Sequence, residues 1–188
     1  GESSNKSTQL IRLPDDLPYG RYYLGACADA NESVIELNEL NNCQVNQLVV
    51  VFEQPSNQPP DCSKARASPN RLWPPNHELV PVSITGITDP DGDSITITIT
   101  RITQDELVNG LGDGDTSPDG FISSGDVKVL LRSERSGKGN GRVYAITFRA
   151  EDGRGGSCTG VVQAGVPHNQ GKGATPIDNG QNYDSTLS

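Results

Sequence analysis

Short stretches in which apolar and polar residues alternate recur along most of the chain, separated by turns rich in glycine, proline and aspartate. In SITITITRIT, for example, Ile95, Ile97 and Ile99 alternate with threonines, which is the period of a strand with one buried face. A helix fits only at residues 104–109, and it would be short. The pattern predicts an all-β protein built as an antiparallel β-sandwich. The predicted strands are 7–13, 21–29, 44–52, 77–87, 93–103, 126–134, 141–152 and 157–166.

A proline-rich polar segment, EQPSNQPPD (53–61), interrupts this pattern and is typical of a semi-rigid linker. Three strands precede it, half of a sandwich, whereas the strands after it are enough for a complete one. The tail, 167–188, has no apolar periodicity and would be disordered alone, so we expect it to extend along another surface such as a neighbouring subunit. The predicted regions are a partial β-domain at 1–53, a linker at 54–61, a sandwich at 62–166 and an extended tail at 167–188.

Composition narrows the function classes. The net charge of −9 leaves no basic face for phosphates, which argues against nucleic-acid binding. No apolar run of membrane-spanning length occurs, so we expect no membrane insertion. The chain starts at Gly1 and has no methionine, which indicates processing or a piece of a longer protein.

The four cysteines allow three pairings. We favour Cys27–Cys43 and Cys62–Cys158, because each bridge then stays within one predicted domain. Four buried free thiols in a cytosolic protein are the alternative. Disulfides persist in oxidising compartments, so this pairing predicts a secreted protein located outside the cell or at its surface.

The segment GDGDTSPDGFISSGD (112–126) concentrates four aspartates before a strand-like run. From Asp115 onward its spacing matches a calcium loop of the EF-hand kind, with Gly120 at the sharp bend. A hard cation takes oxygen ligands, which alternate side chains and one carbonyl would supply, whereas the alternative is a solvated acidic turn. The predicted Ca²⁺ ligands are Asp115, Ser117, Asp119, Phe121 through its carbonyl, Ser123 and Asp126, with Asp113 as a further ligand.

Three weaker acidic clusters favour the same cofactor. TDPDGDS spaces its aspartates two apart before a strand, and AEDGRGG carries an acidic pair at a turn, although either is also typical of a β-turn capped by aspartate. The loop between the first two cysteines is either another calcium site or a polar loop held by their disulfide. The candidate ligands in these clusters are Asp89, Asp91, Asp93, Asp152, Asp29 and Glu36.

Two regions resemble known families. The segment LPYGRYYLGACADANESVIELNELNNC (17–43) resembles the C-terminal half of the CARDB domain, a cell-adhesion-related β-sandwich of bacterial and archaeal surface proteins. The segments LWPPNHELVPV, GRVYAITFRAEDGRGGSCTG and VPHNQG resemble immunoglobulin- or cadherin-like modules of large bacterial secreted proteins. The resemblance implies calcium-stiffened extracellular β-domains for adhesion or spacing, with no catalytic residues. It also implies that the N-terminal strands of the first domain are missing.

An enzyme is disfavoured, because the chain has neither a GxSxG nor a phosphate-binding motif, and His77 at a strand start is typical of a structural residue. A carbohydrate- or ligand-binding accessory module is the alternative, although Trp73 and the tyrosines form no planar row. Two sequons, at Asn5 and Asn31, are candidate glycosylation sites.

Self-association is the remaining expectation. A half-sandwich leaves unpaired edges that recruit another chain, either a neighbouring copy in a filament built by strand complementation or the rest of a longer parent chain. The sequence therefore predicts a calcium-stabilised structural or adhesive protein, with a cell-surface or glycan target as a further partner.

Overall fold

The computed structural model describes residues 12–14, 16–27, 43–110, 112–123, 128–171 and 173–187. The chain divides into two compact units, Gly1–Ser56 and Asn57–Ser188, and the division falls within the predicted linker. All regular elements of the described residues are strands, which confirms the all-β prediction. No helix of this part of the chain is long and apolar enough to cross a membrane.

The described part of the first unit is a β-hairpin of β1 (Gly20–Cys27) and β2 (Cys43–Phe52). The rings of Tyr22 and Phe52 pack in a T-shaped arrangement, with 5.7 Å between their centroids. Cys27 stands directly opposite Cys43 in the register, as the predicted disulfide requires, although the two side chains lie outside the described residues. Of the strand predicted at 7–13, the described residues 12 and 13 are not in a strand. A two-stranded hairpin alone is marginally stable.

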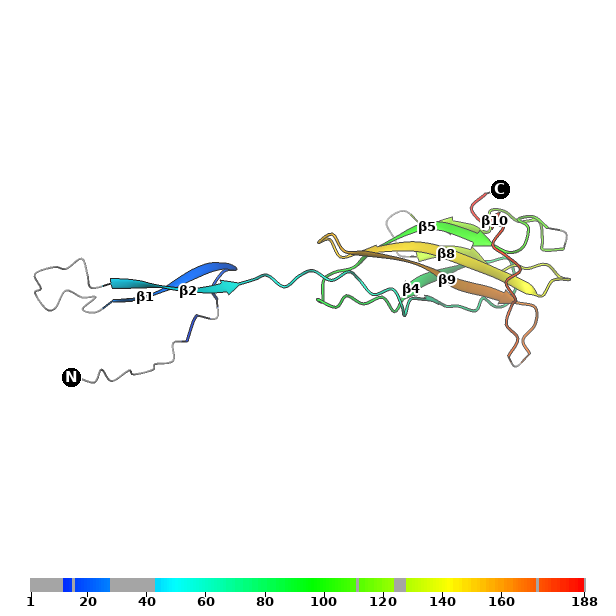
Figure 1. The fold of residues 1–188 in the computed structure, drawn as a ribbon. Helices are drawn as coiled ribbons and strands as arrows, with labels where there is room; N and C mark the ends of the chain where they lie inside the picture. The colour runs from blue at the N-terminus through cyan, green and yellow to red at the C-terminus, as the bar shows by residue number, and fades with distance from the viewer. Residues whose placement is uncertain are drawn as a thin grey trace, which may run out of the picture. The chain divides into compact units, whose positions relative to one another are not determined.

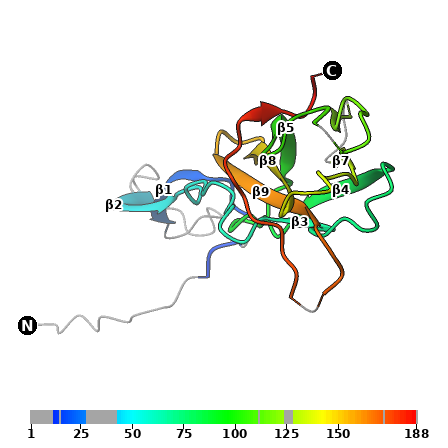
Figure 2. The same ribbon diagram turned by 90° about the vertical axis from the view of Figure 1, so that its right-hand side faces the viewer.

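The second unit is a sandwich of two antiparallel sheets (Figures 1 and 2). The first sheet has the order β3-β4-β7-β6 and the second the order β10-β5-β8-β9. The strands of the first sheet are β3 (Arg66–Ser68), β4 (Leu79–Thr85), β6 (Gly120–Ile122) and β7 (Lys128–Arg132). Those of the second sheet are β5 (Thr96–Gln104), β8 (Gly141–Glu151), β9 (Ser157–Pro167) and β10 (Tyr183–Asp184).

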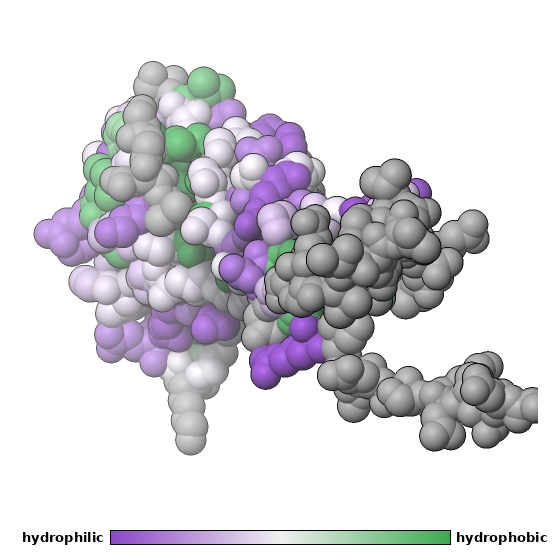
Figure 3. Space-filling view, turned by 90° about the vertical axis from the view of Figure 1, so that its left-hand side faces the viewer, coloured by the Kyte–Doolittle hydropathy of each residue, from purple (hydrophilic) through white to green (hydrophobic). Residues whose placement is uncertain are grey.

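The core fills the space between these two sheets, because alternate residues of each strand point inward. Val82, Val129 and Leu131 of the first sheet face Ile146 and Phe148 of the second, and all five are completely buried. Cys62 and Cys158 form the predicted disulfide between the start of the unit and β9. On the face shown in Figure 3, hydrophilic residues separate small hydrophobic patches.

The helix predicted at 104–109 is wrong. Gln104 is the last residue of β5, and the residues after it form bends and turns. The reason is that Asp105 bonds to β8 instead of to its own segment. Its carboxylate accepts a hydrogen bond from the Val143 N–H at 2.8 Å. Its own N–H donates to the Val143 carbonyl, which extends pairing with β8 rather than starting a helical turn.

The tail lies along its own sandwich. β10 pairs with the end of β5, and the Ser185 N–H donates to the Ile102 carbonyl. The Ser185 carbonyl accepts hydrogen bonds from the N–H groups of Asp119 and Gly120, so the tail connects β5 of the second sheet to β6 of the first. The tail carries no periodic signal in the sequence, because hydrogen bonds of its backbone and polar side chains, rather than an apolar face, hold it on the sandwich.

Candidate functional site

The acidic segment that begins at Gly112 surrounds a buried arginine. Arg142, on β8, is completely buried. It is a charged residue in a strand whose neighbouring residues are apolar. Its Nη1 lies 2.7 Å from Asp119 Oδ2, and its Nη2 lies 3.3 Å from Asp113 Oδ2. Its Nε lies 3.2 Å from Glu106 Oε2. One guanidinium therefore holds three carboxylates, one from Glu106 and two from the acidic segment, with the planar fork that suits arginine for this task.

Further buried groups complete this arginine cluster. Glu134 is fully buried; its Oε1 is 3.7 Å from Arg142 Nη1, and its Oε2 is 2.8 Å from His77 Nδ1 and accepts a hydrogen bond from Thr116. The hydroxyl of Tyr144 donates to the Arg132 carbonyl at 2.8 Å. The cluster thus fastens the loop around residues 113–119 to β7 and β8.

Burial and charge act against each other in this cluster. Burial raises the pKa of Asp119, and this effect exceeds the opposing attraction of Arg142. Burial alone would lower the pKa of Arg142, but the surrounding Tyr144, Asp119 and Glu106 outweigh it and hold that pKa above its ordinary value. The guanidinium therefore remains charged, and it supplies the positive charge that neighbouring carboxylates require.

The described part of the predicted calcium loop is not wrapped around one point. Gly120 begins strand β6, where an extended backbone replaces the sharp bend of a calcium loop, and Phe121 pairs with Leu130 of β7. Asp113 and Asp119 are engaged by Arg142 instead of lying free for a metal ion. Of the other predicted ligands, Asp115 is exposed, Ser117 and Ser123 are half-buried, and Asp126 lies outside the described residues.

The second acidic loop, between β4 and β5, does bring its predicted residues together. Carboxylate oxygens of Asp89, Asp91 and Asp93 all lie within 4.8 Å of one another. The turn is built by Asp89, whose Oδ1 accepts the N–H groups of Asp91 at 2.9 Å and Asp93 at 3.1 Å. Gly92, with φ of 79°, provides the left-handed position between them. Among the described residues, this acidic triad is the one group of three or more such side chains with metal-ligand spacing.

The segment that enters the second unit holds this loop from one side. The Gln58 N–H donates to Asp91 Oδ2 at 2.6 Å, and its side-chain amide donates to Asp91 Oδ1 at 3.2 Å. Asn57 Nδ2 donates to Asp152 Oδ2 at 2.7 Å. The Asn57 bond lowers the pKa of Asp152 and is assisted by the backbone N–H groups of Arg154 and Gly156. Asp152, a predicted ligand, is therefore occupied as a hydrogen-bond acceptor.

Two oxygens of the acidic triad have no partner within the described chain. Asp89 Oδ2 and Asp93 Oδ2 are shielded from solvent, and no donor reaches either atom. A positive group, Arg154, pairs with the other oxygen of Asp93: its Nη2 lies 3.0 Å from Asp93 Oδ1, and its side chain is 59% exposed. Shielded carboxylate oxygens without donors are costly. The arrangement fits a hard divalent cation, which takes oxygen ligands of this kind.

Sequence reasoning missed the groups that decide the difference between the two loops. Arg142 could have been noticed as a charged residue inside the apolar strand GRVYAITF, a pattern that indicates a buried ion pair. Asn57, Gln58 and Arg154 carry no such signal, because their contacts depend on how distant segments meet. The predictions for Asp29, Glu36, Asn5 and Asn31 lie outside the described residues.

Comparisons with known proteins add no identification. No family model matches the chain, and neither the curated proteins nor the solved structures contain a significant match. The resemblance to CARDB and cadherin-like modules therefore stays a prediction.

Proposed function

We propose that this chain is an extracellular structural or adhesive protein, a filament subunit or spacer whose sandwich is stabilised by Ca²⁺. The observation that carries the proposal is the acidic triad Asp89, Asp91 and Asp93, with its two shielded and unpartnered oxygens. The disulfide Cys62–Cys158 supports the extracellular location, since such bonds persist in oxidising compartments.

Calcium would act on local stability at this site. Three carboxylates within 4.8 Å repel one another, and a divalent ion would neutralise them while satisfying Asp89 Oδ2 and Asp93 Oδ2. Asp91 also accepts two hydrogen bonds from Gln58, so an ordered triad would hold the start of the second unit in place. Stiffening of this kind suits a spacer or an adhesive module, and it needs no catalytic residue.

Calorimetric titration of the full chain with Ca²⁺ tests the proposal. We expect binding in the range of extracellular modules, with a dissociation constant of about 10⁻⁴–10⁻³ M. The double variant Asp89→Asn/Asp93→Asn should lose this binding. Asp115→Asn is the matched control, because Asp115 is an exposed aspartate of the other acidic loop, and it should bind as the parent does. Binding that survives the double variant, or no binding by the parent, would contradict the proposal.

A carbohydrate-binding role is the second candidate, and a hollow of about 350 Å³ beside the arginine cluster, lined by both polar and apolar groups, favours it. Carboxylates, amides and one aromatic ring meet there, and these groups suit the hydroxyls and flat faces of sugars. The residues that carry this argument are Asp105, Glu106, Asn140, Asn179 and Tyr183. Binding of the parent chain to a glycan array would support this role if Tyr183→Ala abolishes the binding and leaves the fold intact by circular dichroism. A parent chain that binds no glycan on the array would contradict it.

A further inference from the structure

We propose that two copies of this chain associate through the edge of β9, pairing Thr159–Gln163 antiparallel with the same residues of the second copy. This inference goes beyond the calcium proposal and does not depend on it. It rests on the hydrogen-bonding groups, the side chains and the charges at one edge of the second sheet.

The edge of β9 is partly used by the chain itself. At Gly165 the N–H donates to the Asn70 carbonyl at 3.0 Å, and the carbonyl accepts the Leu72 N–H at 2.9 Å. Alternate residues of a strand present their backbone groups to the same edge, so Gln163, Val161 and Thr159 present theirs as Gly165 does. In the described part of the chain, no backbone group pairs with these three residues on that side.

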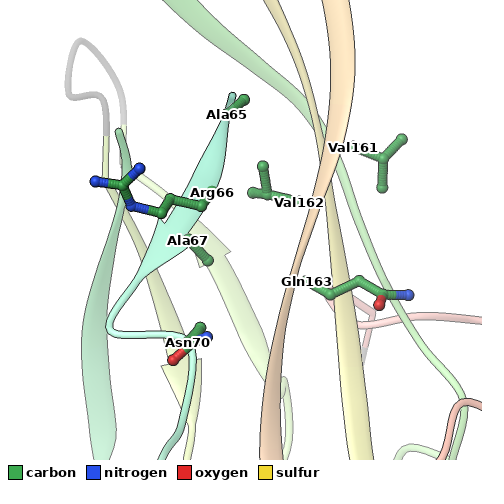
Figure 4. Close-up of a pocket in the computed structure, with 7 residues that line it drawn as sticks. All are labelled: Ala65, Arg66, Ala67, Asn70, Val161, Val162 and Gln163. Carbon is green, nitrogen blue, oxygen red and sulfur yellow. The ribbon is translucent and has the colours of Figure 1, made fainter. Parts of the chain in front are cut away.

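β3 does not cover this stretch. A hollow of about 350 Å³ separates β3 from β9, with Ala65 and Ala67 on one side and Val162 on the other. Figure 4 shows Val162 directed toward β3, whereas Val161 points away from it and the Arg66 side chain points away from β9. Val161 is 60% exposed. The edge is therefore open to an incoming strand.

The open stretch lacks the features with which proteins protect such edges. Thr159, Val161 and Gln163 carry no charge, and β9 runs beside β8 without a register shift. The opposite edge of the same sheet is protected, because β5 has a bulge between Ile99 and Arg101, a charge at Arg101, and β10 beside its end. The edges at β3 and β6 are only three residues long.

The chemistry of the edge matches a second copy. Antiparallel pairing about a two-fold axis at Val161 sets Val161 against the Val161 of the other copy and Thr159 against its Gln163, with no like charges opposed. It also brings opposite charges together. Arg149 lies beside Thr159 in the register, and the Gln163 amide donates to Asp178 at 2.8 Å. The two-fold axis therefore places Arg149 of each copy, which also pairs with its own Glu151 at 2.9 Å, toward Asp178 of the other.

A charge-complementation experiment tests this geometry in the full chain. We expect the parent chain to show concentration-dependent dimerisation by sedimentation velocity, in calcium and in EDTA alike. Val161→Lys and Val161→Glu each place like charges on the two-fold axis and should weaken dimerisation about tenfold or more. Because the residue meets its own equivalent, an equimolar mixture of the two variants should restore the dimer as a heterodimer.

The control is Val51→Lys, an exposed valine of β2 in the first unit, which should dimerise as the parent does. Unchanged thermal unfolding of each variant shows that its fold is intact. A parent chain that stays monomeric at all concentrations, a mixture that fails to restore association, or loss of the dimer in Val51→Lys would each overturn the proposal. Calcium binding that persists in the monomeric variants would show that the dimer proposal and the calcium proposal are tested independently.

Discussion

The two acidic loops of the second unit have similar sequences and different electrostatic surroundings. In the loop around Asp113 and Asp119, buried carboxylates meet the guanidinium of Arg142. In the loop of Asp89, Asp91 and Asp93, two shielded oxygens meet no donor within the described chain, and the cation beside the triad is the exposed Arg154. Asp119 Oδ1 of the first loop also accepts no hydrogen bond, but it lies 3.8 Å from Arg132 Nε. The comparison teaches that closely spaced aspartates indicate a need for positive charge, which a distant side chain can meet as well as a metal ion.

Removing the buried cation of the first loop, Arg142, should lower the free energy of unfolding more than any other change considered below. Arg142→Met would leave Asp113 buried without its counter-charge and Asp119 with only Arg132 Nε, 3.8 Å away, and breaking a buried pair in this way costs about 3–5 kcal/mol. Urea unfolding at neutral pH measures the loss. Arg149→Met is the control, because its pair with Glu151 is exposed and such pairs contribute about 0–1 kcal/mol. Equal effects of the two substitutions would show that Arg142 does not neutralise the first loop.

The second-largest effect should come from acid, which weakens the hydrogen bond between Asn57 and Asp152 beside the second loop. The pKa of Asp152 is lowered from 3.8 in the folded chain, first by the Asn57 hydrogen bond. Its stabilisation is therefore fully present above that ordinary value and is lost as the pH falls through the lower, folded-state pKa. Asp152→Asn should reduce the free energy of unfolding at neutral pH, and its difference from the parent should shrink below pH 3.8.

Urea unfolding of both proteins in EDTA at a series of pH values measures this difference. A difference that is constant with pH would show that the charge of Asp152 does not matter, and only the shape of the side chain would then remain as the cause.

The smallest effect concerns the exposed cation of the second loop. Arg154 lies 3.0 Å from Asp93 Oδ1 and would compete with a bound metal ion. Exposed pairs contribute about 0.2–1 kcal/mol, so Arg154→Gln should tighten calcium binding about 1.4- to fivefold. Calorimetric titration measures the change, with Arg149→Gln as the matched surface control. Weaker binding after the substitution would mean that Arg154 orders the site and does not oppose the ion.

Much of the fold could be predicted from local pattern. The alternation in residues 93–103 and 141–152 predicted β5 and β8, because one buried face imposes a period of two on any strand. β3, β6 and β10 were missed, since two or three residues are too few to show a period. The helix prediction at 104–109 failed because Asp105 bonds to the backbone of β8, a partner far away in the chain.

For the candidate site too, local spacing was informative and contacts between distant segments were not predicted. The spacing in TDPDGDS was enough to predict the triad of Asp89, Asp91 and Asp93, because a short turn brings residues two apart onto one side. The similar spacing around Asp115 predicted a calcium loop, and the structure places two of its members, Asp113 and Asp119, against Arg142. There, Gly120 and Phe121 pair with β7, and this pairing draws Asp119 into the core beside Arg142.

The sequence by itself determined the all-β class and the presence of clustered carboxylates, because each depends on composition or on short-range pattern. It only favoured the Cys62–Cys158 pairing, from the predicted domain boundary, and the structure joins these two cysteines across 96 residues. Only the tertiary structure decided which cluster is neutralised from within, where the tail lies and which edge stays open. These outcomes depend on groups that are distant in the chain, such as Asp119 with Arg142 and Ser185 with Ile102. Electrostatic and hydrogen-bonding partners are set by proximity in space, which the packing of the two sheets creates.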